Sequence, residues 1–526
     1  MKCLIFAALI AASVGLTDME SAILALTGAS QIEELDEEVM ERYRSLAAHP
    51  LDINAAGRAK MISCGLFTRF QAASIIDCRE NSGDILSFAE LALVDGFNEE
   101  IVKALRPFIK LESGRAPGEK TDTKLSQEAM ARSSVKATDG DCAFAAGVKY
   151  GLNWGEKAEF NWASRITYDN QELQIGTVSA AYYGRRHIGK VVLGDFNARF
   201  GQGLAAWTGF SLSGLTTVQS FRRNGTGISP TSSFTSNCKG AGVELNFGRW
   251  TAGAAYSLSG GEPFANVCWT GRKLSAGLTA GPGAYSADFR AGLPGLSIFS
   301  EAGWNGAPMG LLGLVWIPRY GIKTGAVAKF KDGKLQAAAG AEFKCFQANF
   351  ETNINYTKRT EQYRLTLTGS REWTVGKALL KPSLKLSGKL KPQETSPFRG
   401  DIRADLSAGI GNCCLSTRYD AVFGKAFAWQ WYLEGSRKTG KSAFYARAAL
   451  FQVDNWDDRI YVYERDVPGA FNVPAYYGRG WSASLMASVK FGIKSRHALH
   501  ARLSAVQYFT DKPGKLEAKL QYNLQL

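Results

Sequence analysis

The C-terminal part of the chain alternates between apolar and polar positions. The alternation is most regular at the end of the chain, where every second residue is apolar: Leu516, Ala518, Leu520, Tyr522, Leu524 and Leu526. A period of two predicts β-strands with one apolar and one polar face. Looser versions, separated by short breaks rich in Gly, Asn, Asp or Lys, occur at Cys142–Gly151, Ala158–Tyr168, Val191–Phe200, Ala241–Phe247, Leu335–Phe343, Ala443–Phe451 and Leu485–Phe491.

Two architectures can accommodate so many amphipathic strands. A soluble sandwich buries the apolar faces, whereas a transmembrane barrel turns them toward lipid and keeps a polar lumen. We favour the barrel over an exported protein of several sandwiches, because residues 141–526 form a nearly unbroken meander too long for one sandwich. Roughly 15–20 residues for each strand with its turn give about 18–24 strands. The predicted fold is therefore mainly β, a large antiparallel transmembrane β-barrel.

A small all-α region is predicted ahead of the barrel, over residues 30–112. In Gln31–Ala47 the apolar residues recur at intervals of three and four, which is the period of an amphipathic helix. Shorter helices follow, with predicted ends at Gly83 and Pro107. Four polar residues stand where their side chains would cap these helices: Asn54, Thr68, Ser87 and Asn98.

Two further segments complete the predicted organisation. Residues 1–16 are typical of a secretory signal peptide, since Lys2 precedes a short apolar run and a Ser13-Val14-Gly15 cleavage site. Residues 113–140 are polar, lack apolar periodicity and predict a linker. No apolar run after residue 16 is long enough for a membrane-spanning helix, which takes roughly 20 residues.

Charge divides the chain in two. The whole sequence carries a net charge of +14, yet residues 17–112 hold 17 acidic and 9 basic side chains, whereas residues 113–526 hold 31 and 52. The basic part suits anionic headgroups, lipopolysaccharide phosphates or an anionic solute. The acidic part is a poor electrostatic match for nucleic acid.

The helical region resembles the ComEA-type helix-hairpin-helix domain. Leu51-Asp52-Ile53-Asn54-Ala55-Ala56 matches the opening of that family, and Ile75-Ile76-Asp77-Cys78-Arg79-Glu80 matches its central helix. The strand region resembles the companion barrel of Bacteroidota outer-membrane proteins that carry such a module, on the stretches 193–204, 459–467 and 473–480. This resemblance implies a barrel in the outer membrane with the helical domain in the periplasm, and no settled activity.

The two predicted hairpins are the candidate contact sites of the helical domain. A Gly-x-Gly hairpin brings backbone N–H groups close to a phosphate, but Phe67 and Asn98 replace the second glycine here. We therefore favour a protein-docking or plug role over DNA binding, which remains the alternative. The candidate contacts are Gly65, Leu66, Phe67 and Arg69 in the first hairpin, and Gly96, Phe97, Asn98 and Lys103 in the second.

Polar residues of the strand region are candidates for the lumen or its loops. Asp195, Arg199 and Gln202 lie in the glycine-rich segment 194–214, which is either an inward-folded constriction or a bulged strand; we favour the bulge. Arg222 and Arg223 either select anions or solvate a loop. Arg459, Glu464 and Arg465 belong to a charged ladder, which favours a structural network over a catalytic acid pair.

No motif in the sequence indicates an enzyme. His497 and His500 fall on opposite faces of a predicted strand, and the scattered cysteines lack metal-ligand spacing. We therefore expect neither catalytic residues nor a metal or other cofactor. The sequence predicts a non-enzymatic outer-membrane barrel for transport or envelope assembly. Its expected partners are outer-membrane lipid and a periplasmic or outer-membrane protein, and the alternative is a DNA-uptake protein.

Overall fold

The computed structural model describes residues 17–112 and 125–526, apart from residues 170, 185–186, 213, 237, 320, 346–347, 359–360, 395 and 494–495. The predicted signal peptide, residues 1–16, lies outside the described residues, as do residues 113–124 of the predicted linker. Among the described helices none is both long and apolar enough to cross a membrane.

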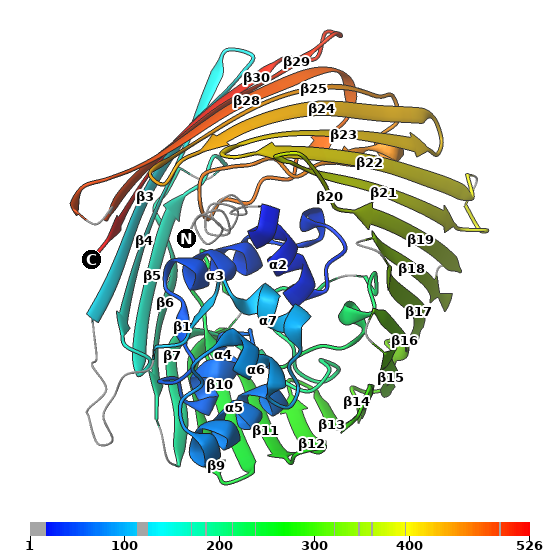
Figure 1. The fold of residues 1–526 in the computed structure, drawn as a ribbon. Coiled ribbons are helices and arrows are strands. Elements are labelled where there is room, and N and C mark those ends of the chain that lie inside the picture. The colour runs from blue at the N-terminus through cyan, green and yellow to red at the C-terminus, as the bar shows by residue number, and fades with distance from the viewer. Residues whose placement is uncertain are drawn as a thin grey trace.

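Most of the described chain forms one closed barrel of antiparallel strands (Figure 1). Strands that follow one another in sequence are neighbours in the wall, and the last strand, β30 (Lys515–Gln525), pairs with the first, β3 (Leu125–Thr138), to close the ring. The described wall has 24 strands when the short β20 is counted with β19 and β8 is left out, which lies within the predicted range.

The remaining strands of the wall follow the predicted alternation. Every segment that the alternation predicted overlaps one of them. In chain order they are β4 (Asp141–Trp154), β5 (Ala158–Ile166), β6 (Gln174–Tyr183), β7 (Ile188–Arg199), β9 (Cys238–Phe247), β10 (Trp250–Ser257), β11 (Glu262–Thr270), β12 (Leu274–Gly281), β13 (Ala284–Leu293), β14 (Leu296–Trp304), β15 (Pro308–Arg319), β16 (Ile322–Lys331), β17 (Lys334–Cys345), β18 (Ala348–Thr357), β19 (Gln362–Arg371) with β20 (Trp373–Val375), β21 (Ala378–Leu390), β22 (Phe398–Ile410), β23 (Cys413–Phe423), β24 (Phe427–Lys438), β25 (Ser442–Val453), β28 (Gly478–Phe491) and β29 (His497–Tyr508).

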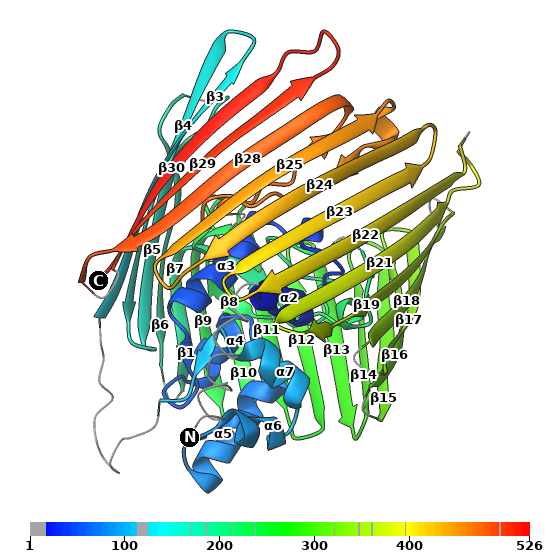
Figure 2. The same cartoon turned by 45° about the horizontal axis from the view of Figure 1, so that its top comes forward.

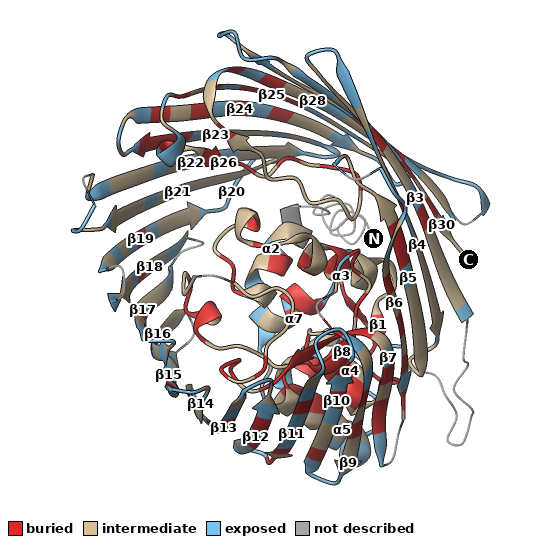
Figure 3. Cartoon of the chain, turned by 180° about the vertical axis from the view of Figure 1, so that it is seen from behind, coloured by how far each residue is buried: buried red, intermediate tan, exposed pale blue. Residues whose placement is uncertain are grey.

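The apolar faces of these strands point outward. On β30, Leu516 and Leu520 are exposed, whereas Gln521 on the opposite face is fully buried. Figure 3 shows the same interchange of exposed and buried positions along many strands of the wall. An apolar outer surface around a polar interior is the arrangement of a transmembrane barrel and the inverse of a sandwich, so the alternative of several soluble sandwiches is excluded.

The acidic N-terminal part lies inside the ring of strands (Figures 1 and 2), and we call residues 17–112 the lumen domain. The strands β1 and β2 pair in parallel within it. Its elements are the helices α2 (Thr17–Thr27), α3 (Glu37–Ala48), α4 (Arg58–Ser63), α5 (Arg69–Ser82), α6 (Phe88–Leu93) and α7 (Glu99–Leu105), the short helix η1 (Ile32–Glu34), and the strands β1 (Leu51–Asp52) and β2 (Ile109–Lys110).

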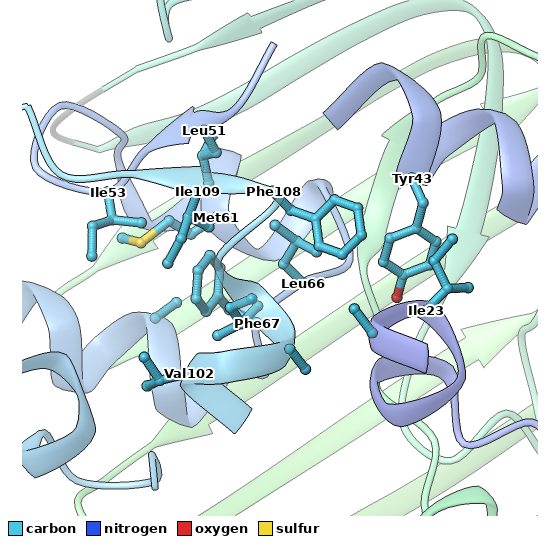
Figure 4. Packing of buried hydrophobic residues seen from close by; sticks show 14 of the residues in the cluster. Ile23, Tyr43, Leu51, Ile53, Met61, Leu66, Phe67, Val102, Phe108 and Ile109 are labelled. Atoms are coloured by element: carbon cyan, nitrogen blue, oxygen red, sulfur yellow. The ribbon is translucent and has the colours of Figure 1, made fainter. Parts of the chain in front are cut away.

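The lumen domain has an apolar core of its own. Tyr43 and Phe108 pack with tilted rings whose centroids are 5.0 Å apart, and Ile23 of α2 belongs to the same cluster (Figure 4). Burial of these side chains explains why short helices with few internal hydrogen bonds stay formed. The domain therefore includes α2 and starts earlier than the predicted residue 30.

The predicted helix caps are mostly confirmed. Thr68 caps α5 in a capping box with Gln71, and Asn98 caps α7. Asn54 is the exception, because α4 begins only after Gly57. The Asn54 amide instead donates to the carbonyl of Ile85 at 2.9 Å and accepts from the Ile85 N–H at 3.0 Å. It ties together two segments of the domain rather than starting a helix.

The predicted linker is too long. Residues 125–138 form β3, whose pairing with β30 and β4 closes the barrel. The outward row of β3 contains Leu125 and Val135 but also Ala and Ser, so the alternation of hydrophobicity is weak. The barrel therefore starts at Leu125 instead of residue 141.

Two long loops distinguish the two mouths of the barrel. Residues 200–237 join β7 to β9 and residues 454–477 join β25 to β28, both at the mouth opposite to the one where β3 starts and β30 ends. We call these the long-loop mouth and the chain-end mouth. The loops contain short elements, which are η2 (Gln219–Phe221), β8 (Gly227–Pro230), η4 (Trp456–Asp458), β26 (Ile460–Tyr461) and β27 (Ala475–Tyr476).

Candidate functional site

The centre of the lumen is occupied by an ion-pair network between the lumen domain and the wall. Glu33 of η1 accepts a hydrogen bond from Arg418 of β23 at 2.6 Å and lies 3.6 Å from Arg403 of β22. It also accepts from the backbone N–H of Tyr463 at 3.1 Å. Burial would raise the pKa of Glu33, but the two guanidinium groups outweigh it and hold the pKa at about 2.

Further acidic side chains of the lumen domain meet basic side chains of the wall and loops. Glu38 pairs with Arg199 at 2.7 Å, and Glu41 lies 3.6 Å from Lys149. The remaining pairs of this polarity are Glu20 with Arg465 at 2.6 Å, Glu37 with Arg132 at 3.5 Å, and Glu100 with Lys344 at 2.5 Å. These contacts come from strands all around the ring, so they hold the domain from several sides.

Two ion pairs have the opposite polarity. Lys60 of α4 donates to Glu159 of β5 at 2.7 Å, and Arg44 of α3 donates to Glu128 of β3 at 3.0 Å. Arg44 also donates to Glu41 within its own helix. Reciprocal charges of this kind fix one orientation of a domain in a lumen, because a rotated domain would place like charges together.

These contacts explain part of the uneven charge of the sequence. The acidic half of the chain sits inside the basic half, and its carboxylates neutralise part of the excess of lysine and arginine. The sequence alone suggested lipid headgroups or a solute as the anionic match. The structure shows that much of this match is internal.

The glycine-rich segment 194–214 begins in the wall as the end of β7, and residues 200–212 then fold into the lumen, so the favoured interpretation as a simple bulged strand is wrong. Phe210 and Leu212 pack against the core of the lumen domain. Gly201 and Gly203 have positive φ angles and allow the predicted bends, which here turn the chain inward. Further along the same loop, Thr217 donates to the carbonyl of Gly28 at 2.6 Å.

Two of the three candidate residues, Arg199 and Gln202, hold the inward fold, and the third, Asp195, binds the neighbouring strand β6. The Asp195 carboxylate accepts from the Val178 N–H at 2.7 Å. Arg199 reaches Glu38, as described above. The Gln202 amide oxygen accepts from the N–H of Arg223 at 3.0 Å. These contacts are structural, because each side chain is buried against the chain itself.

The neighbouring residues Arg222 and Arg223 differ in their contacts. Arg223 donates to the Ser211 hydroxyl at 2.7 Å, and its guanidinium lies 5.1 Å from the ring centroid of Trp207. Arg222 has no ion pair and no side-chain hydrogen bond within the described part of the chain. Burial alone lowers the pKa of Arg222 to about 10.

The second long loop also enters the lumen, where the residues of the predicted charged ladder contact the wall. Glu464 accepts from Arg502 of β29 at 2.7 Å, and Arg465 donates to Glu434 of β24 at 2.8 Å. Arg459 stays near the rim and donates to the Tyr461 hydroxyl at 2.7 Å. These contacts form a paired network.

Two tyrosines of that loop pack inside the barrel. Tyr463 packs against the core of the lumen domain, and Tyr476 is buried with its hydroxyl donating to Glu464 at 2.7 Å. Their place in an inward-folded loop keeps them from the lipid interface where a girdle lies.

The two candidate hairpins differ in exposure. Gly65 and Gly96 have positive φ angles, as tight turns require. In the first hairpin Leu66 and Phe67 are buried, and Arg69 donates to Asn266 of β11 at 3.2 Å. The turn is therefore packed between the domain and the wall.

The second hairpin lies open to solvent. Asn98 and Lys103 are exposed, and Phe97 packs edge-on against Phe67 with ring centroids 6.1 Å apart. The acidic residues Glu99 and Glu100 stand beside this turn. It therefore offers an anion only one exposed lysine and an arginine, Arg106, against two carboxylates.

The described residues contain no group of three or more His, Cys, Asp or Glu side chains arranged to hold a metal ion. The site is instead a filled lumen. Sequence reasoning identified Arg199, Glu464 and Arg465, but it missed Glu33, Arg403 and Arg418. Each of these three is an isolated charge in its own segment, and only the fold brings them together.

Comparisons with known proteins give no family. No protein-family model and no curated protein matches the chain. Solved structures with some likeness are the outer-membrane proteins OpdK, OccK2 (OpdF) in complex with glucuronate, and OpdQ, all of Pseudomonas aeruginosa. Their identities are 9%, 11% and 9%, and their TM-scores are 0.35, 0.36 and 0.35. Each match covers 77% of this chain, and 99%, 98% and 98% of the other chain. A likeness this weak carries no argument.

Proposed function

We propose that this protein is a non-enzymatic outer-membrane channel whose own N-terminal domain plugs the lumen. The observation that carries the proposal is the set of ion pairs that hold the lumen domain against the wall, with Glu33 between Arg403 and Arg418 at its centre. Inward-folded loops add a second closure, since Phe210 and Tyr463 pack on the core of the domain. Transport then requires the domain to move within the lumen or to leave it.

The loop lengths support a periplasmic origin of the plug. In bacterial outer-membrane barrels the short turns face the periplasm and the long loops face outward. Here β4 and β5 are joined by residues 155–157 at the chain-end mouth, and the long loops stand at the other mouth. Residues 17–112 precede β3 in the chain and so enter from the chain-end side. In this proposed orientation the helices α4 to α7 face the periplasm.

A protein partner in the periplasm would have a surface to bind. At the chain-end mouth the exposed residues of α5, α6 and the turn after each include two large apolar side chains, Leu86 and Leu93, which are 67% and 87% exposed. Acidic side chains surround them: Asp77, Glu80, Asp84, Asp95 and Glu99. The matching partner is a protein with basic side chains around an apolar contact.

DNA uptake has weaker support. The first hairpin is packed against the wall through Arg69, and the open second hairpin is surrounded by carboxylates. A duplex would meet a repulsive surface at the chain-end mouth.

Neutralising the carboxylate anchors tests the plug. We would substitute Glu33, Glu38 and Glu41 by Gln together and measure the swelling of proteoliposomes in neutral solutes of graded size. The proposal predicts faster entry of larger solutes than with the wild-type protein, because unpaired wall arginines no longer hold the domain.

A matched control variant loses the same number of acidic charges from the same domain. Glu80, Asp84 and Glu99 are exposed and pair with nothing in the wall among the described residues, so replacing them with Gln or Asn should leave swelling at the wild-type rate. If the anchor variant were no more permeable than this control, the plug proposal would be rejected.

A further inference from the structure

One sector of the lumen has basic side chains that the lumen domain leaves without counter-charges. Arg222 and Arg223 lie on the long loop between β7 and β9, Arg290 lies on β13, and Lys329 and Lys331 lie on β16. Elsewhere around the lumen, carboxylates such as Glu33 and Glu38 neutralise the wall. Among the described residues no carboxylate of the lumen domain pairs with any of these five cations.

These five cations gather around one apolar cluster. Phe221 and Phe299 both belong to it, and Phe299 is the register partner of Arg290 across β13 and β14. Arg222 directly follows Phe221, and its charge and that of Arg290 are close enough to repel each other.

The other two cations join from β16. Lys329 is the register partner of Leu311 in the same cluster, and Lys331 donates to the carbonyl of Leu204, another member, at 2.7 Å. Lys329 lies within electrostatic reach of Arg223 and Lys331. The cluster thus carries two groups of cations, Arg222 with Arg290 and Arg223 with Lys329 and Lys331.

Nearby carboxylates do not balance this charge. Glu301 accepts from the Gln202 N–H at 2.6 Å and from the Ser286 hydroxyl at 2.6 Å, so its oxygens are already engaged. Asp288 is its register partner across β13 and β14. Asp332, in the turn after β16, lies within electrostatic reach of Lys329. Counting all three as ionised, five positive charges face three negative ones. Arg222 and Arg290 make no ion pair or side-chain hydrogen bond with a described residue.

Unpaired guanidinium groups away from bulk water are unfavourable unless an anion binds them. The free-energy cost of desolvating a charge is offset only by a close opposite charge. Arginine presents several N–H donors in a planar fork that fits a carboxylate or a phosphate. Two adjacent forks match a ligand that carries more than one negative charge. Both side chains keep partial exposure, so a solute in the lumen can reach them.

We propose that Arg222 and Arg290, supported by Arg223, Lys329 and Lys331, form a binding site for a small polyvalent anion, a carboxylate or a phosphate, inside the lumen. The inference deepens the proposed transport function by naming the class of solute. Binding itself does not depend on whether the lumen domain acts as a plug.

Calorimetric titration of the full-length protein in detergent tests the site. The probes are citrate, inorganic phosphate, glucose and spermidine at low ionic strength. We expect citrate or phosphate to bind with an affinity that falls as salt rises, and we expect no binding of glucose or spermidine. The double variant Arg222→Gln, Arg290→Gln should weaken anion binding at least tenfold.

The control variant is Arg272→Gln, which removes an exposed arginine in the turn between β11 and β12. It should keep the wild-type affinity. The double variant should also unfold at the same temperature as the wild-type protein or a higher one, because it removes two unpaired charges. A purely structural pair would instead lose stability on substitution.

Three results would overturn the site. The first is that neither the wild-type protein nor the anchor variant, with Glu33, Glu38 and Glu41 replaced by Gln, binds an anion. The second is an equal loss of affinity in Arg272→Gln and in the double variant. The third is binding of glucose as tightly as citrate. Failure of the plug proposal would look different, since it concerns swelling rates and leaves these titrations unchanged.

Discussion

Glu33 and Arg418 are separated by 385 residues in sequence and meet at 2.6 Å in the middle of the lumen. The Glu33 side chain is only 3% exposed, so this contact is made largely out of water. A charge buried in this way is stable only with its partners in place. The pair therefore fixes the position of the lumen domain relative to the barrel wall.

Glu33→Gln should loosen the domain strongly. Breaking a buried ion pair by removing one partner costs about 3 kcal/mol or more, because the remaining charges are left without compensation. We expect faster hydrogen exchange in α2 and α3 of the full-length protein, with exchange in the barrel strands unchanged. Glu80→Gln, at an exposed position of the same domain, is the control and should change neither. Equal exchange in the two variants would contradict the role of Glu33.

The lumen domain should keep its position in the lumen in mild acid. The folded pKa of Glu33, at about 2, lies below its ordinary value of 4.5. A group with a depressed pKa contributes its full stabilisation above the unfolded value and loses it as pH falls toward the folded value. Protease sensitivity of residues 17–48 should therefore stay constant from pH 7 to pH 5 and rise only below about pH 4. Release of the domain at pH 6 would show that another group controls it.

Asn54→Ala should weaken the lumen domain without opening the barrel. The Asn54 side chain satisfies both the N–H and the carbonyl of Ile85, and all these groups are buried. Leaving them without partners costs about 1–3 kcal/mol. Urea titration followed by hydrogen exchange near Ile85 measures the loss. Asn81→Ala removes an exposed amide that donates to the Asp77 carbonyl, and it should cost far less.

Duplex DNA should not bind the intact protein, even at low ionic strength. The hairpin around Gly65 is covered by the wall, and the face around Gly96 is rich in carboxylates. A filter-binding or polarisation assay checks this, with the triple variant Glu80→Lys, Asp84→Lys, Glu99→Lys as the positive control. Salt-sensitive binding by the wild-type protein would instead favour DNA uptake.

Much of the barrel follows from local pattern, because lipid outside and water inside impose the same alternation on every strand. β30 shows this clearly, with Leu520 exposed and Gln521 buried. The prediction failed at β3, where Ala and Ser replace larger apolar residues on the outer face. Because residues 125–138 are mostly small or polar, their sequence predicted a linker instead of a strand.

The lumen site could be predicted only in part. The acidic and basic halves of the sequence indicated a charge match, but Glu33 and Arg418 carry no local sign of being partners. Their contact depends on the insertion of one domain into another, which periodicity does not encode. The inward fold of the loop around Arg199 was missed for the same reason, since its glycines are equally compatible with a bulge.

Single-channel conductance in planar bilayers tests the central claim most directly. The full-length protein should show a small conductance, and a variant lacking residues 17–112 should open a wide, weakly selective pore, because the wall of 24 strands then surrounds an empty lumen. Equal conductances of the two proteins, both inserted as folded barrels, would contradict the account.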